Sequence, residues 1–300
     1  MDKKPYIALF ISVVSVSFAA IFIVSVSEGV SPLSISFYRL LFTFLLICPV
    51  VLLRKKFRDE LRGLSRSNFL IMAGIGIILA LHFALWIASL DFTSVASSVI
   101  LVTAHPVLVA PVAHYFLKEK LSLINIGGIC LSLFGVAILV LGNYDLGPLT
   151  IDSLQGNILA ILGGVAAGLY ILGGRKMRKT VSVASYAFVV YAVGAIVLLI
   201  ICLSFSASII NLSSKDYGII FLMAIVSGIF GHTLYNWSLG HIRASIASIV
   251  LLGEPIGSTL LAIAMPWIPQ VPSKYTVLGG AIILLGIYLT SRKKEESLHA

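Results

Sequence analysis

The stretch 243–265, RASIASIVLLGEPIGSTLLAIAM, decides the fold of this chain, because the earlier stretch 94–116, SVASSVILVTAHPVLVAPVAHYF, repeats its pattern. A shift of 149 residues aligns Pro255 with Pro106 and Glu254 with His105. Both stretches are apolar and long enough to cross a bilayer, which takes about 20 residues in a helix. The chain therefore contains the same membrane segment twice, and each copy has a polar residue followed by proline near its centre.

The repeat extends beyond these two stretches. The same shift places LWIASL (85–90) over LYNWSL (234–239), and a shift of 151 places Gly128 and Gly135 over Gly279 and Gly286. The repeating unit holds five apolar segments. Because five is odd, the second unit must enter the membrane upside down, and such inverted repeats are typical of secondary transporters.

The composition indicates an integral membrane protein. The chain is 59% hydrophobic and only 11% charged, whereas soluble domains carry about 25% charged residues. Gly and Ser are scattered through the apolar segments without strict alternation, which favours helices over barrel strands. We predict an all-α protein with ten transmembrane helices, at about 6–26, 33–53, 69–90, 94–116, 122–141, 156–174, 183–205, 217–238, 244–266 and 275–291.

The positions of the basic residues predict the orientation. With the N-terminus in the cytoplasm, eighteen Lys and Arg residues lie in cytoplasmic segments, whereas Lys215 and Lys274 lie outside and Arg39 lies within a span. Both termini are therefore predicted to be cytoplasmic. A net charge of +9 could suggest a nucleic-acid partner, but the basic residues lie in short loops between apolar segments, so we expect none.

The predicted domains follow the duplication. The first repeat covers 1–141, an extracytoplasmic linker covers 142–154, the second repeat covers 155–291, and 292–300 form a cytoplasmic tail. The longest cytoplasmic loop, 54–68, and the tail are too short for the signalling regions of a receptor. No Walker A sequence is present, so ATP is not expected to drive the protein directly.

The two prolines predict interruptions of their helices. Pro106 and Pro255 have no N–H to donate to the preceding turn, so each helix should loosen or kink there. Glu254 lies about 16 Å along a helix from Arg243, near the middle of the membrane. A carboxylate at that depth is costly and usually faces a cavity. Glu254 either binds a substrate amine or carries a proton, or it is a structural group that bonds the carbonyl freed by Pro255.

Arg39 lies within the second span and has three alternatives. Its side chain could extend to the outer surface, bind an anionic group of the substrate, or pair with Glu28 or Asp91 at the outer end. The equivalent residue in the second repeat is Val190, so the repeat does not decide between them. A structural or gating role is favoured.

Histidines and aromatic residues lie on two helices that correspond in the repeat, so they are expected to face one central cavity. Aromatic walls suit a cationic, aromatic or amino-acid-like substrate. Zinc is not expected, because no paired-histidine spacing occurs. The candidate cavity residues are His82, Trp86, His105, His232, Tyr235, Asn236 and Trp237, together with Arg39 and Glu254.

The chain resembles EamA-type members of the drug/metabolite transporter superfamily. The resemblance covers about 6–291 and rests on the five-plus-five arrangement, SPLSISFYRLL (31–41), ASIASIVLLGEPIGSTLLA (244–262) and the Gly-x6-Gly pairs. Two features depart from the family: His105 replaces a small or acidic residue, and the second repeat has PWIPQVPSK (266–274) where the family has Gly-Glu. The first repeat has LKEKLS (117–122) at the corresponding place.

The resemblance implies a secondary transporter of small metabolites that works by alternating access. Export of amino acids or related amines is the commonest theme in the family, so we expect that activity, with protons as a candidate coupling ion and no cofactor. The expected location is the inner (cytoplasmic) membrane, and a complete five-plus-five chain can work as a monomer. The alternatives are a flippase for lipid-linked substrates and an intramembrane enzyme.

Overall fold

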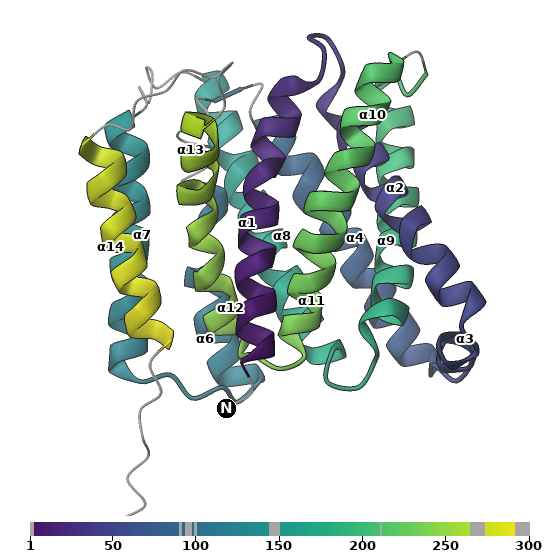
Figure 1. Cartoon of the computed structure of the whole chain (residues 1–300), viewed down its shortest axis with the longest axis horizontal. Helices are drawn as coiled ribbons and strands as arrows, with labels where there is room; N and C mark the ends of the chain where they lie inside the picture. Colours follow the sequence, from purple (N-terminus) through teal and green to yellow (C-terminus); the bar gives the residue numbers. More distant parts are fainter. Residues whose placement is uncertain are drawn as a thin grey trace, which may run out of the picture.

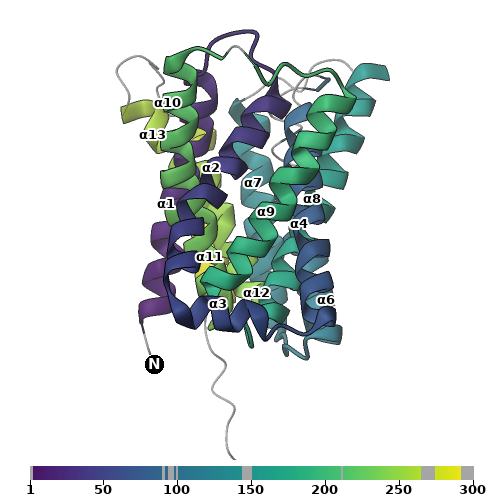
Figure 2. The ribbon, with the colours of Figure 1, turned by 90° about the vertical axis from the view of Figure 1, so that its right-hand side faces the viewer.

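The protein is a bundle of helices that lie side by side (Figures 1 and 2). The structure, a computed structural model, describes residues 3–89, 92, 93, 98, 101–143, 151–210, 212–264 and 274–291. No β-strand occurs in these residues. The all-helical class predicted from the sequence is therefore confirmed.

The first repeat comprises α1 (Lys4–Ser25), α2 (Pro32–Leu53), α3 (Lys55–Arg62), α4 (Arg66–Ser89), α6 (Pro106–Phe116) and α7 (Leu123–Asn143). The second comprises α8 (Ile151–Met177), α9 (Val183–Ser204), α10 (Ser214–Met223), η1 (Ala224–Thr233), α11 (Leu234–Leu239), α12 (Ala244–Val250), η2 (Leu251–Gly253), α13 (Glu254–Ala264) and α14 (Lys274–Ser291).

The helices are apolar enough to cross a membrane. Six are long, apolar segments of the kind that span a bilayer, and four shorter apolar segments cover 101–116, 123–138, 244–258 and 277–290. Together they follow the order of the predicted spans. Large apolar side chains such as Phe10, Phe116 and Leu123 are exposed on the bundle. Apolar helices whose outer side chains are also apolar are typical of a multi-pass membrane protein.

Some predicted boundaries differ from the structure. The connection 54–68 was predicted to be a loop, but it contains the short charged helix α3. The helix α8 begins at Ile151, within the predicted linker 142–154, while residues 144–150 of that linker lie outside the described residues. The predicted span 94–116 is described at Ser98 and from Leu101 onward, and the predicted tail 292–300 lies outside the described part.

Helices that correspond in the two repeats pack in corresponding ways. The corresponding pairs α2 and α9, and α7 and α14, pack directly against each other. The first helix, α1, packs against η1, α11 and α13, whereas its counterpart α8 packs against their counterparts α4 and α6. Exchanging the two repeats therefore preserves these main helix pairs. In addition, α1 begins at the end of the bundle where α8 finishes (Figure 1).

Glycines make the contact between α7 and α14 possible. A Cβ atom added at Gly128 would lie 2.7 Å from the carbonyl oxygen of Gly286, and one added at Gly135 would lie 2.8 Å from the carbonyl oxygen of Gly279. The glycines that correspond in the repeat thus meet crosswise, which lets the two backbones approach closely, as small residues do in membrane helix pairs.

Replacing Gly128 with alanine is expected to lower the free energy of unfolding by about 1–3 kcal/mol, the usual cost of overpacking. The added methyl group has no room beside Gly286. The matched control is Gly127→Ala, because a Cβ atom at Gly127 meets nothing within 4 Å. Thermal unfolding of the purified protein in detergent measures both variants. Equal stability of the two would contradict the packing described for α7 and α14.

Candidate substrate site

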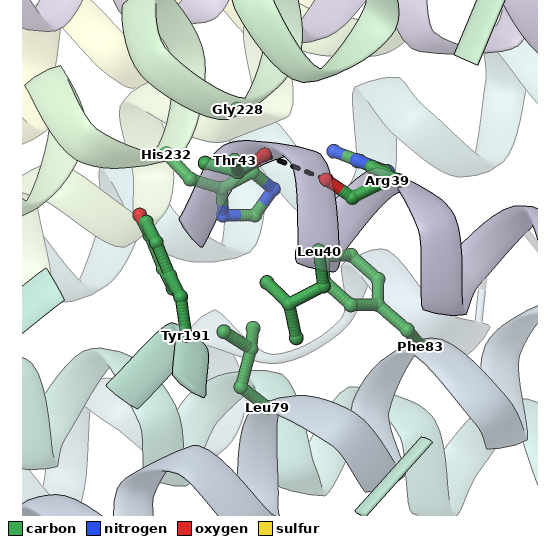
Figure 3. Close-up of a pocket in the computed structure, with 8 residues that line it drawn as sticks. All are labelled: Arg39, Leu40, Thr43, Leu79, Phe83, Tyr191, Gly228 and His232. Atoms are coloured by element: carbon green, nitrogen blue, oxygen red, sulfur yellow. Dashed lines mark hydrogen bonds between the residues drawn. The ribbon is translucent and has the colours of Figure 1, made fainter. Parts of the chain in front are cut away.

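A pocket lies among α2, α4, α9 and η1, where the two repeats meet (Figure 3). These elements form two corresponding pairs, since α9 is the counterpart of α2 and η1 belongs to the counterpart of α4. The pocket therefore lies at the interface between the two repeats. Its lining residues are Arg39, Leu40, Thr43, Leu79, Phe83, Tyr191, Gly228 and His232.

Arg39 turns toward this pocket rather than toward the outer surface. Its side chain is only 4% exposed, and its guanidinium carbon lies 4.6 Å from the centre of the Phe83 ring. Glu28 is exposed and makes no ion pair with Arg39, and Asp91 lies outside the described residues. The structure therefore excludes two of the alternatives for Arg39: its side chain does not extend to the outer surface, and it does not pair with Glu28.

Glu254 is the carboxylate that acts on Arg39. The two charges interact electrostatically, yet their side chains do not come within the 4.0 Å of an ion pair. Glu254 is partly buried and begins α13, beside α1, where Ser17 Oγ donates a hydrogen bond to its backbone carbonyl (3.3 Å). An arginine and a glutamate thus lie inside an apolar bundle without direct contact.

The element η1 shapes one wall of the pocket and was not predicted from the sequence. It is a π-helix, whose wider turn often marks a functional site. The Thr233 hydroxyl donates to the carbonyl of Gly228, five residues earlier (3.0 Å). A Cβ atom on Gly228 would lie 2.9 Å from Thr43 Cγ2, so this glycine lets α2 come close. The wide turn places His232 at the pocket.

His82 and Trp86 lie on α4, next to the pocket. His82 Nδ1 donates to the carbonyl of Gly163 (2.9 Å), and the His82 ring stacks on Trp86 at 6.1 Å between centroids and 7° between planes. His105 is partly buried and lies in the turn directly before α6. The buried atoms Trp86 Nε1 and His105 Nδ1 have no hydrogen-bond partner in the described part of the chain.

The predicted group on the eighth span separates into two places. Asn236 Nδ2 donates to the Tyr170 hydroxyl (2.5 Å) and forms a longer bond with Tyr191 (3.4 Å), which lines the pocket. Tyr235 is buried in the core. Trp237, in contrast, packs on His241 at 4.6 Å, away from the pocket. Within the described ranges, no three His, Cys, Asp or Glu side chains are arranged as metal ligands would be.

Both proline positions interrupt their helices. A turn at 104–105 precedes Pro106, where α6 begins, and the 3₁₀ turn η2 precedes Glu254 and Pro255. The physical reason is the missing proline N–H, which leaves the preceding turn without its regular hydrogen bond. These irregular turns lie in corresponding helices of the two repeats.

Phe83 and Tyr191 line the pocket but were missing from the residues chosen from the sequence. A signal for Tyr191 was present, because it directly follows Val190, the counterpart of Arg39 in the repeat. Phe83 directly follows His82 and could not be distinguished from the core aromatics around it by spacing alone.

A carboxylate network closes the end of the bundle that carries the N-terminus, which we call the basic end. Glu119 forms an ion pair with Arg175 at the end of α8 (2.9 Å). It also accepts hydrogen bonds from the backbone N–H groups of Ala244 (3.2 Å) and Ser245 (3.5 Å), at the start of α12. Arg175 in turn donates to the carbonyl of Leu239 (2.7 Å). One loop of the first repeat is thus bonded to two helices of the second.

A second carboxylate at the basic end joins α3 to α9. Glu60 accepts hydrogen bonds from the backbone N–H of Ser182 (2.8 Å), from the Ser182 hydroxyl and from the Ser185 hydroxyl (2.5 Å). Partial burial raises the pKa of Glu60, but these hydrogen bonds and the charge of Arg178 outweigh burial, and the net effect lowers the pKa. The ionised carboxylate is thereby favoured in the folded state.

Glu60 is expected to make stability depend on pH in acid. Because its pKa is lower in the folded than in the unfolded protein, its contribution is complete above the unfolded pKa and is lost as pH falls through the folded pKa. Glu60→Gln should therefore melt below the wild type at neutral pH, and the gap should close in acid. Thermal unfolding over a pH series, with the exposed Asp59→Asn as control, measures this. A gap that stays constant with pH would contradict the assignment.

Comparison with known proteins identifies the family and the fold. The sequence model of the EamA-like transporter family matches residues 3–141 and 154–292. An uncharacterized transporter of Archaeoglobus fulgidus is 22% identical over 99% of this chain and 100% of its own length, and the uncharacterized transporter YyaM of Bacillus subtilis is 25% identical over 75% and 74%. A solved crystal structure has the same fold, with a TM-score of 0.81 at 16% identity and 97% of each chain covered.

Proposed function

Because this chain belongs to the EamA-like transporter family, we propose that it is a secondary-active exporter of amino acids or related amines that works by alternating access. The observation that carries this proposal is the buried Arg39, whose side chain lines a pocket with aromatic walls at the meeting point of the two repeats and makes no ion pair with a described carboxylate. Charged groups inside a membrane protein are costly and usually serve the transported substrate or ion.

The proposed location is the inner (cytoplasmic) membrane. The proposed topology has ten membrane-crossing segments, and both termini lie in the cytoplasm. The basic end carries the N-terminus, α3 and the loop around Glu119 (Figure 1). Lysine and arginine concentrate on the cytoplasmic side of membrane proteins, so we assign the basic end to that side.

The network of Glu119 then acts as a cytoplasmic gate. It joins the loop 117–122 of one repeat to α8 and α12 of the other, so the repeats cannot separate at this end while the bonds persist. Alternating access requires these contacts to open when the substrate site faces the cytoplasm. Protons are the proposed coupling ion, with Glu254 as their carrier.

The test is transport by purified protein in proteoliposomes. Vesicles preloaded with unlabelled amino acids or amines should accumulate the labelled compound by counterflow, and an imposed pH gradient should drive net movement. Labelled lipid in the same vesicles distinguishes a flippase. Lipid movement without metabolite counterflow would replace the proposed function with the flippase alternative.

A further inference from the structure

We infer that Arg39 and His232 together bind the carboxylate of the transported solute, so that the transporter selects amino acids over the corresponding amines. This inference rests on the proposed transport function and narrows its substrate class. The two side chains come from different repeats, Arg39 from α2 and His232 from η1, and both line the same pocket (Figure 3).

The first observation is that Arg39 has no acceptor of its own. A guanidinium carries five N–H donors, and a buried one ordinarily bonds to a carboxylate or to backbone carbonyls. In the described part of the chain, no side-chain N–H of Arg39 donates a hydrogen bond, and one face of the guanidinium rests on the Phe83 ring at 4.6 Å. Donors that face a pocket without a partner suit an anionic ligand.

The second observation concerns His232, whose imidazole ring also makes no hydrogen bond to a described residue. Its ring packs edge-on against Phe83 at 5.5 Å and against Tyr170 at 6.3 Å, so its position is fixed by aromatic contacts. The neighbouring Thr43 hydroxyl already donates to the carbonyl of Arg39 (2.7 Å). Arg39 and His232 are therefore the side chains at this pocket whose N–H groups remain to donate to a bound anion.

The third observation is the separation from Glu254. A direct ion pair would satisfy Arg39 and remove its use for a ligand, but the two groups stay more than 4.0 Å apart. Arg39 therefore stays available to bind the carboxylate of a ligand in the pocket. Planar two-pronged bonding of a carboxylate is the interaction for which a guanidinium is shaped.

The remaining walls indicate the rest of the molecule. Leu40, Leu79, Phe83 and Tyr191 give the pocket apolar and aromatic surfaces. The Tyr191 hydroxyl is already bonded to Thr233 and Asn236, and the rest of these surfaces pack well against an aliphatic or aromatic side chain. The pocket measures about 10 Å³ in this conformation, room for about one water-sized group, so an amino acid with an apolar side chain is the ligand expected once the surrounding helices move apart.

Matched ligands test the inference on the full-length protein. Thermal stabilisation is measured with L-leucine, L-methionine and L-phenylalanine, and with the primary amide and the decarboxylated amine of each. The amides and amines keep the nitrogen and the side chain but lack the carboxylate. To raise the melting temperature by the same amount, the amides and amines should be needed at roughly tenfold or higher concentration than the amino acids.

Variants test whether Arg39 and His232 cause the preference for amino acids over amines. Arg39→Gln should bind the amino acid and the amine equally weakly, whereas Arg62→Gln, on the exposed surface of α3, should keep the wild-type preference. His232→Gln should reduce the preference in part. The comparison of ligands on the wild type needs no variant, so a misfolded Arg39→Gln protein does not remove the test.

Three outcomes would overturn the inference: amines that bind as well as amino acids, an Arg39→Gln protein that keeps the preference, or the absence of stabilisation by any of the three amino acids. Counterflow separates this failure from failure of the proposed function. If proteoliposomes exchange amines or sugars but not amino acids, the transporter assignment stands and the carboxylate site does not.

Discussion

Replacing Glu254 with glutamine is expected to lower the free energy of unfolding by about 3 kcal/mol, the usual cost of an uncompensated charge near the centre of a membrane helix bundle. The substitution removes the negative charge that acts on Arg39, and Arg39 is only 4% exposed. Thermal unfolding of the purified protein measures the loss. Proton-driven transport in proteoliposomes should also stop, because the variant has no carboxyl to release a proton.

The double variant Arg39→Gln with Glu254→Gln makes this prediction specific. Each single variant leaves one buried charge without its partner, whereas the double variant leaves none. The double variant should therefore lose less unfolding free energy than the two single variants lose together. Glu28→Gln, on the exposed connection before α2, is the control and should melt like the wild type. Strictly additive losses would show that the two charges do not stabilise each other.

Glu119→Gln is expected to cost about 3 kcal/mol as well, for a different reason. The side chains of Arg175 and Glu119 are 13% and 5% exposed, and removing one partner of a buried ion pair leaves the other charge uncompensated. The exposed Lys120→Gln, in the same loop, is the matched control.

Hydrogen–deuterium exchange identifies the part of the protein that Glu119 holds. Its carboxylate accepts hydrogen bonds from the N–H groups of Ala244 and Ser245, so exchange should become faster at the start of α12 in the Glu119→Gln variant. Exchange in α9, which is held by Glu60 instead, should not change. Uniformly faster exchange over the whole bundle would indicate general destabilisation and would contradict a local gate.

The resemblance to the EamA-type family is confirmed by the family match over both repeats. The family could be recognised without a structure because it depends on the length of the apolar segments and on the spacing of glycines within them. Both can be read from single segments of the sequence. The crossing of each of the ten segments, the cytoplasmic termini and amino-acid export remain predictions.

The candidate site was predictable only in part. Arg39, His82 and His232 were chosen because polar residues are rare within apolar helices, and the structure places all three at or beside the pocket. Trp237 was chosen because it lies next to Asn236, yet its side chain packs on His241. The π-helix η1 changes the residues per turn, so a helical face drawn with regular spacing misplaces the residues after it.

The sequence by itself determined the helical class, the duplication and the family, because each of these depends on hydrophobic length and on repeated letters along one chain. Only the tertiary structure decided that Arg39 turns inward, that Tyr191 and Phe83 complete the pocket, and that Glu119 joins two repeats. Those features depend on which side chains of distant helices meet. That is set by close packing of the helices, as where Gly228 leaves room for the Thr43 side chain, and not by any local pattern.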